Sequence, residues 1–134
     1  LITRETARLG LCSEDGKLEF AFDVERRVML VDALGTLDEC RFSWRGMPVS
    51  KEIARVHYRG TDWHRDIEEA KRRDKVNWKP LVASSPAPLP PELARAISQI
   101  YQAYANDLTG RRWFDAPPLS DVVNGVRSSF FDPR

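Results

Sequence analysis

The segment that decides the fold is KLEFAFDVERRVMLVDAL, residues 17–34, in which two apolar runs flank a charged centre. Residues 17–23 alternate between polar and apolar side chains, as the two faces of a half-buried strand do. Residues 27–34 form a second run whose apolar side chains favour a strand. The short charged centre predicts that the two runs pair as an antiparallel hairpin.

The register of this hairpin follows from the position of its turn. An even-numbered loop centred between Glu25 and Arg26 pairs residues whose numbers add up to 51. Glu19 then lies directly opposite Asp32. One face of the hairpin is wholly apolar and carries Leu18, Phe20, Phe22, Met29, Val31 and Ala33. We expect this face to pack on the core.

Two carboxylates that face each other across a ladder repel, because their Cβ atoms are only about 4.5–5.5 Å apart. The pairing alone leaves three interpretations of Glu19 and Asp32 open. They belong to a solvated face with Lys17 as counter-ion, or they form a general acid/base pair in which one pKa is raised. In the third interpretation they bind Mg²⁺, which takes carboxylate oxygens and completes its shell with water and substrate phosphates.

Outside the hairpin and the loop that follows it, the chain is predicted to be mostly helical. Apolar spacing and end signals predict helices at residues 2–9, 50–58, 61–73, 91–109 and 119–126. Ser50 and Thr61 are the expected N-caps of the second and third helices, and Gly110 ends the fourth. Strands followed by helices predict an α+β fold, an antiparallel sheet with packed helices.

Composition limits the class of protein. The chain has 134 residues, 42% of them apolar, which suits one packed domain. A net charge of +1 disfavours a nucleic-acid partner, and the apolar runs are too short to span a membrane. Two cysteines, Cys12 and Cys40, are too few for a disulfide scaffold, so we expect free thiols and a cytoplasmic location.

Several short motifs stand in a fixed order around the hairpin. DGKLEF at residues 15–20 leads into it, and LVD at residues 30–32 ends with Asp32. GTLDECRF follows at residues 35–42, and SKE at residues 50–52, with Arg55, opens the second helix. Across about residues 10–60 these motifs resemble the phosphoribosylaminoimidazole-succinocarboxamide synthase (SAICAR synthetase) family.

The resemblance implies a fold and a reaction. The fold is the C-terminal, substrate- and metal-binding lobe of an ATP-grasp-like enzyme, a single lobe over residues 1–134. Residues 1–83 hold the hairpin and first helices, and residues 84–134 hold a connector and the C-terminal helices. The reaction joins carboxyaminoimidazole ribotide to L-aspartate at the expense of ATP, through an acyl phosphate, in purine biosynthesis.

The resemblance also implies which side chains act. Glu19 and Asp32 match the metal-binding acids of the family, so Mg²⁺ is the expected cofactor and ATP the co-substrate. The implied catalytic group is Lys17, Glu19 and Asp32. The implied substrate-binding residues are Asp15, Lys17, Asp38, Arg41, Lys51 and Arg55. Among them, the fork of Arg41 suits bidentate contact with a carboxylate or phosphate.

Three positions depart from the family pattern. Ala33 stands where the family has Glu, Ala21 where it has Gly, and Leu37 where it has Pro. By strand alternation Ala33 belongs to the apolar face, so it lies away from any metal held by Asp32. Because the acidic pair and the cations are present, these changes favour a divergent branch of the family.

The glycine pattern bears on ATP binding. The seven glycines lie at least six residues apart, so they form neither a G-x-G motif nor a phosphate-cradling loop. We expect the N-terminal ATP lobe to be absent from this chain and to act as its partner. The chain is then part of a carbon–nitrogen ligase and is inactive alone. The sequence also allows a homo-oligomer. The alternative is a non-catalytic relative that binds a phosphorylated ligand or partner.

Overall fold

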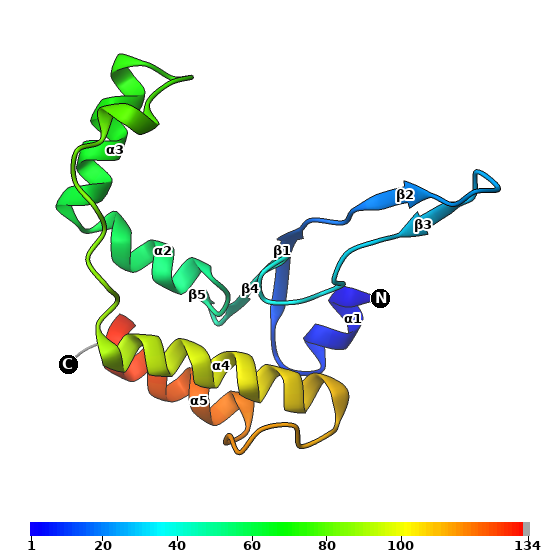
Figure 1. Ribbon diagram of the computed structural model, residues 1–134. Coiled ribbons are helices and arrows are strands. Elements are labelled where there is room, and N and C mark those ends of the chain that lie inside the picture. Colours follow the sequence, from blue (N-terminus) through cyan, green and yellow to red (C-terminus); the bar gives the residue numbers. More distant parts are fainter. Residues whose placement is uncertain (133–134) are drawn as a thin grey trace.

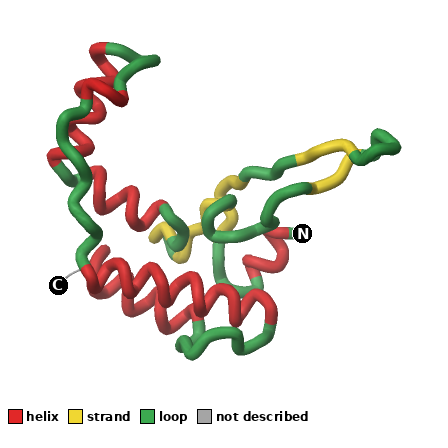
Figure 2. The backbone as a smooth tube through the Cα atoms, viewed as in Figure 1, coloured by secondary structure: helices red, strands yellow, loops and turns green. Residues whose placement is uncertain are grey.

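Two small antiparallel sheets and a layer of helices make up the fold, which the computed structural model describes over residues 1–132 (Figures 1 and 2). The predicted α+β class, with an antiparallel sheet and packed helices, is confirmed. In chain order the elements are α1 (Ile2–Ala7), β1 (Cys12–Gly16), β2 (Phe20–Phe22), β3 (Val28–Leu30), β4 (Cys40–Trp44), β5 (Met47–Pro48), α2 (Glu52–Arg59), α3 (Asp62–Arg73), the 3₁₀ turn η1 (Lys79–Leu81), α4 (Pro91–Thr109), α5 (Leu119–Val126) and the π-helical turn η2 (Arg127–Phe131).

The three-stranded sheet is built around β4, which pairs with β1 on one side and β5 on the other. A two-residue turn joins β4 to β5, where Arg45 and Gly46 have φ angles of +47° and +82°. Positive φ at both positions is what a type I′ hairpin turn requires. The sequence does not predict these three strands: β1 is a short segment before the hairpin, and β4 and β5 lie in the segment expected to be a loop.

The core lies between this sheet and the two C-terminal helices. Phe42 of β4, Ile100 of α4 and Val123 of α5 are at most 1% exposed, and α4 and α5 pack against each other (Figure 1). The hydroxyl of Tyr104 donates a hydrogen bond of 2.5 Å to the backbone carbonyl of Gly35. Burial raises the pKa of Tyr104 to about 12, so the hydroxyl stays a donor that ties α4 to the segment after the hairpin.

The predicted hairpin register is wrong by one residue. Phe20 pairs with Leu30 and Phe22 with Val28, so paired numbers add up to 50 instead of 51. The cause is an odd-numbered loop: the backbone N–H of Asp23 bonds to the carbonyl of Arg27, and three residues lie between them. The last of these three, Arg26, has a φ of +65°, the left-handed residue that a three-residue hairpin loop contains.

The expected core side of the hairpin is also wrong. Phe20 and Phe22 are each 62% exposed and Val28 is 64% exposed. The hairpin extends away from the body of the molecule (Figure 1). The shift in register divides its apolar side chains between both faces, so the single apolar face that the prediction required does not form.

The helices lie close to their predicted ranges. The hydroxyl of Thr61 accepts a hydrogen bond from the backbone N–H of His64 at 3.4 Å and caps α3 as predicted. Gly110 ends α4 in the left-handed conformation. At α2 the N-cap position falls on Lys51 rather than Ser50, although the Ser50 hydroxyl still accepts from a backbone N–H of the first turn.

Cys12 is exposed, Cys40 is buried, and both are free thiols, as expected. Burial raises the pKa of the Cys40 thiol, which keeps it uncharged in the sheet. Over residues 1–132, no helix combines the length and the apolar character that crossing a membrane requires.

A pair of phenylalanine variants tests where the core lies. Phe42→Ala should lower the free energy of unfolding by about 3–5 kcal/mol, because it leaves a cavity in the core. Phe22→Ala should change it by no more than about 0.5 kcal/mol, because that ring is already in solvent. Urea denaturation measures both values. Comparable losses in the two variants would mean that the hairpin belongs to the core of this chain.

Candidate functional site

A concavity of about 310 Å³ lies where β1 and β4 meet the start of α2. Its walls are almost entirely charged. They are formed by Asp15, Gly16, Lys17, Asp38, Glu39, Arg41, Lys51 and Arg55. Every residue that was predicted to contact substrate is in this set, so the fold brings together three sequence motifs that the chain keeps apart.

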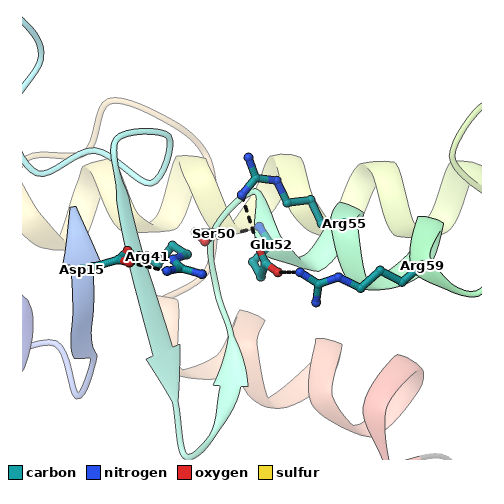
Figure 3. A network of polar contacts seen from close by, with 6 residues as sticks. All are labelled: Asp15, Arg41, Ser50, Glu52, Arg55 and Arg59. Atoms are coloured by element: carbon teal, nitrogen blue, oxygen red, sulfur yellow. Dashed lines mark hydrogen bonds and ion pairs between the residues drawn. The ribbon is translucent and has the colours of Figure 1, made fainter. Parts of the chain in front are cut away.

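Asp15 and Arg41 form an ion pair across the β1–β4 ladder, where they are direct partners (Figure 3). The guanidinium binds both carboxylate oxygens: Nε donates to Oδ1 at 2.7 Å, and Nη2 donates to Oδ2. Hydrogen bonding to Arg41 lowers the pKa of Asp15 below its ordinary value. The register shifts by one residue between Ser13 and Asp15, which marks a β-bulge. Because of this shift, Asp15 is the residue that pairs with Arg41.

Lys17 lies between three carboxylates. Its ammonium pairs with Glu19 and lies 3.9 Å from Asp32 and 3.7 Å from Glu39. The hydrogen bond to Glu19 is the main reason that the pKa of Lys17 is raised. The backbone N–H of Lys17 also donates to the carbonyl of Glu39 at 2.8 Å, so the main chain fixes the position from which the side chain extends.

Glu19 and Asp32 meet at Lys17 although they are not cross-strand partners. Glu19 lies opposite Val31, whose backbone N–H donates to its carbonyl at 3.1 Å. The chain leaves the ladder after β3, and a carboxylate oxygen of Asp32 accepts from the N–H of Ala33 at 2.7 Å. The predicted direct opposition is therefore wrong, while the predicted proximity to Lys17 as counter-ion is present in the structure.

Two further residues of the site were not predicted. Glu39 lies two residues before Arg41. Because side chains alternate along a strand, this spacing could have placed Glu39 on the same face of the sheet as Arg41. Tyr101 of α4 donates its hydroxyl to a carboxylate oxygen of Asp38 at 2.8 Å. Burial and this bond raise the pKa of Tyr101 well above its ordinary range, so it remains a donor. Tyr101 lies beside the apolar stripe of its helix, so the sequence pattern gave it no role.

The basic start of α2 adds two positive charges to the concavity. Lys51 is the N-cap of the helix, and Arg55 lies one turn later. Arg55 donates to Glu52 at 3.2 Å, and the same carboxylate pairs with Arg59 (Figure 3). The carboxylate of Glu52 thus holds the guanidinium of Arg55, which lines the concavity together with Lys51.

The donor set suits a metal ion that has few protein ligands. No cluster of three or more histidine, cysteine or acidic side chains able to hold a metal occurs among residues 1–132. Glu19 and Asp32 nevertheless direct oxygens toward one cation, the ammonium of Lys17. Such a pair fits Mg²⁺, which commonly takes one or two carboxylates and fills its shell with waters and substrate phosphates.

A larger concavity, about 790 Å³, lies between α1 and the end of α4 and is lined in part by Arg8, Arg111 and Arg112. These cations interact with close neighbours: Arg112 pairs with Asp115, and Arg111 lies over the ring of Trp113 at 5.7 Å. None of the family motifs reaches it. The smaller concavity is therefore the better candidate for a functional site.

Charged walls with paired carboxylates and guanidinium and ammonium groups are of a kind that suits phosphates and carboxylates.

Comparison with known proteins shows which proteins the chain is similar to. Over 127 residues, 95% of the chain, it is 46% identical to an Archaeoglobus fulgidus protein described provisionally as a phosphoribosylaminoimidazole-succinocarboxamide synthase. It is 33% identical over 120 residues to the synthase of Thermoplasma acidophilum and 31% identical over 119 residues to that of Thermoplasma volcanium, each match covering 84% of the chain.

These matches confirm the resemblance to SAICAR synthetases over nearly the whole chain. The chain spans 38–39% of the length of these relatives. No family model matches it.

The Asp15–Arg41 pair gives a prediction about pH. Because the pKa of Asp15 is lower in the folded chain than in the unfolded chain, the pair stabilises the fold at neutral pH, and this contribution is lost as the pH falls through the folded pKa. Arg41→Gln should raise the pKa of Asp15 toward its ordinary value. Carbon-13 NMR titration of the carboxyl group measures it, and Arg112→Gln is the control that should leave Asp15 unchanged. An unshifted Asp15 in Arg41→Gln would contradict the pairing.

Proposed function

We propose that this chain is the substrate- and metal-binding part of a SAICAR synthetase, which joins carboxyaminoimidazole ribotide to L-aspartate with ATP in purine biosynthesis. One observation carries the proposal: all six residues that the family motifs mark as substrate contacts line one concavity. The match to relatives with this name supports it as well.

The cations of the concavity bind the charged ends of the ribotide in this proposal. Asp15 holds the Arg41 guanidinium in place through Nε and Nη2, which leaves the other N–H groups of the fork for a ligand. A ribotide phosphate or carboxylate takes positions beside this pair, with Lys51 and Arg55 facing it from α2. Holding the ribotide rigidly in this way brings its reacting carboxylate to a fixed position relative to ATP and aspartate.

Asp38 and Tyr101 form the polar contact for the sugar. The hydroxyl of Tyr101 occupies one carboxylate oxygen of Asp38 and so fixes the direction of the other. A ribose hydroxyl is the donor that suits this second oxygen. The helix α4, which carries Tyr101, thereby links the substrate site to the core.

Glu19 and Asp32 would hold Mg²⁺ in this proposal, and Lys17 beside them would face substrate phosphate. The ion would supply charge neutralisation for the phosphates of ATP. Glu39 keeps an acceptor near the Lys17 ammonium. Because the Lys17 and Glu19 side chains are 58% and 46% exposed, a change of partners would have little cost in desolvation.

A non-catalytic relative that binds a phosphorylated ligand is the second candidate. The observation that favours it is Ala33, which stands where the family pattern has Glu. Both candidates use the same concavity, and they differ in turnover.

The acidic pair gives the first prediction of the proposal. Glu19→Gln and Asp32→Asn should each abolish the Mg²⁺-dependent part of ribotide binding, measured by calorimetry with and without Mg²⁺. The free energy of unfolding without metal should change by no more than about 1 kcal/mol, because these ion pairs are exposed. If both variants unfolded much more easily than the parent without metal, the pair would be structural.

The arginine fork gives the second prediction. Arg41→Lys keeps the charge but loses the planar fork that can bind Asp15 and a ligand at once, so ribotide affinity should fall by about 1–3 kcal/mol. Arg112→Lys, in the larger concavity, should leave the affinity unchanged. Equal losses at both positions would show that diffuse electrostatics, and not this site, binds the ribotide.

Turnover separates the two candidates. The chain is assayed for ADP release with ATP, ribotide and L-aspartate, alone and mixed with the portion of the Archaeoglobus fulgidus relative that it does not match. We expect no turnover by the chain alone and ligation in the mixture. ADP release by the chain alone at the rate of the full-length relative would refute the incomplete-enzyme proposal, and ribotide binding without turnover in the mixture would favour the non-catalytic relative.

A further inference from the structure

Glu52, in the first turn of α2, carries an unusually buried carboxylate beside the concavity. Its side chain is only 13% exposed, whereas those of Asp15 and Glu39 in the wall are 53% and 22% exposed. The backbone N–H of Glu52 donates to the hydroxyl of the buried Ser50 at 3.3 Å, and the next residue, Ile53, is 2% exposed in the core. The backbone that carries this carboxylate is therefore fixed by the fold.

The two carboxylate oxygens of Glu52 bind two different arginines (Figure 3). Oε2 accepts a hydrogen bond from Nη1 of Arg55 at 3.2 Å, and Oε1 accepts one from Nη2 of Arg59. Arg55 lines the concavity, whereas Arg59 lies one turn further along α2 and is not part of its wall. Because Arg59 occupies Oε1, Glu52 makes a single bond to Arg55 and leaves the other N–H groups of that guanidinium for a ligand.

This arrangement differs from an ordinary ion pair on a helix surface. Arg55 follows Glu52 at the common spacing i, i+3, but Arg59 follows at i, i+7, two full turns away. Both arginine side chains are 55% exposed, while the carboxylate between them is largely removed from water. Burial of a charge costs free energy that its partners must offset, so an acid that served only the helix surface would need neither this burial nor a second arginine.

We propose that Glu52 is a positioning residue of the candidate site, which holds the guanidinium of Arg55 in the wall of the concavity. Arg59 is the counter-charge that keeps the second oxygen of Glu52 occupied. Arg55 then meets a phosphate or carboxylate group of the ligand in an orientation that is already set. A long side chain that is ordered before binding loses less conformational entropy when the ligand arrives. This inference rests on the proposed function, in which Arg55 contacts the ribotide.

The sign of one substitution separates positioning from simple electrostatics. The charge of Glu52 reaches the concavity, because it adds to the raised pKa of Arg41, whose main cause is the hydrogen bond to Asp15. If only the electrostatic field mattered, removal of this negative charge in Glu52→Gln would tighten the binding of an anion. If Glu52 positions Arg55, the same substitution weakens that binding.

Calorimetric titration of the chain with carboxyaminoimidazole ribotide measures this sign. We expect Glu52→Gln to lower the ribotide affinity about three- to tenfold, the size of a coupling between residues in direct contact. The double variant Glu52→Gln with Arg59→Gln keeps the net charge of the parent chain and should also lose affinity. The matched control is Glu68→Gln, which breaks an i, i+3 pair with Lys71 on α3 and should leave the affinity unchanged. Unchanged or tighter binding by either Glu52 variant would overturn the proposal.

Nitrogen-15 relaxation of the arginine Nε–H groups tests the same contact without any ligand. Glu52→Gln should lower the order parameter of the Arg55 Nε–H, and Glu68→Gln should leave it unchanged. Equal order of Arg55 in the parent chain and in Glu52→Gln would overturn the proposal. Loss of the α2 helix in the backbone chemical shifts of Glu52→Gln would overturn it too, because the role of Glu52 is then structural. If the parent chain binds no ribotide, the proposed function fails, while the order of Arg55 still decides whether Glu52 holds it.

Discussion

The antiparallel ladder between β1 and β4 is the contact on which the rest of the structure depends. It sets Asp15 against Arg41 and Gly16 against Cys40, and it brings the backbone of Lys17 within 2.8 Å of Glu39. The ladder is held in place because β4 also carries Phe42 into the core between the sheet and the helices α4 and α5. One strand therefore presents the charged Arg41 on one side and anchors the hydrophobic core on the other.

The sequence predicted those features of the fold and of the candidate site that depend on residues close together in the chain. Thr61 and Gly110 act through their own helix ends, and the sequence located both. The motif residues of the candidate site were also identified from the sequence, although only the fold shows that they share one concavity. Tyr101 could not be found this way, because its bond to Asp38 joins residues 63 positions apart.

The hairpin shows why the remaining features escaped prediction. Its register depends on one residue, Arg26, in a left-handed conformation that arginine seldom adopts, so the composition of the turn gave no sign of an odd-numbered loop. The core side was inferred from the alternation of apolar side chains, which shows only that they share a face. Whether that face packs on the core depends on contacts with distant parts of the chain, and Phe20 and Phe22 are each 62% exposed.

The proposed function requires one site, centred on Lys17 and its carboxylates, to bind metal and ribotide together. Paramagnetic relaxation by Mn²⁺ in place of Mg²⁺, measured on backbone amides with ribotide present, shows whether it does. We expect the strongest broadening at Glu19 and Asp32, weaker broadening at Asp38 and Arg41, and none at Asp107 or Arg112 beside the larger concavity. Broadening centred on the larger concavity, or none near Lys17, would contradict the account.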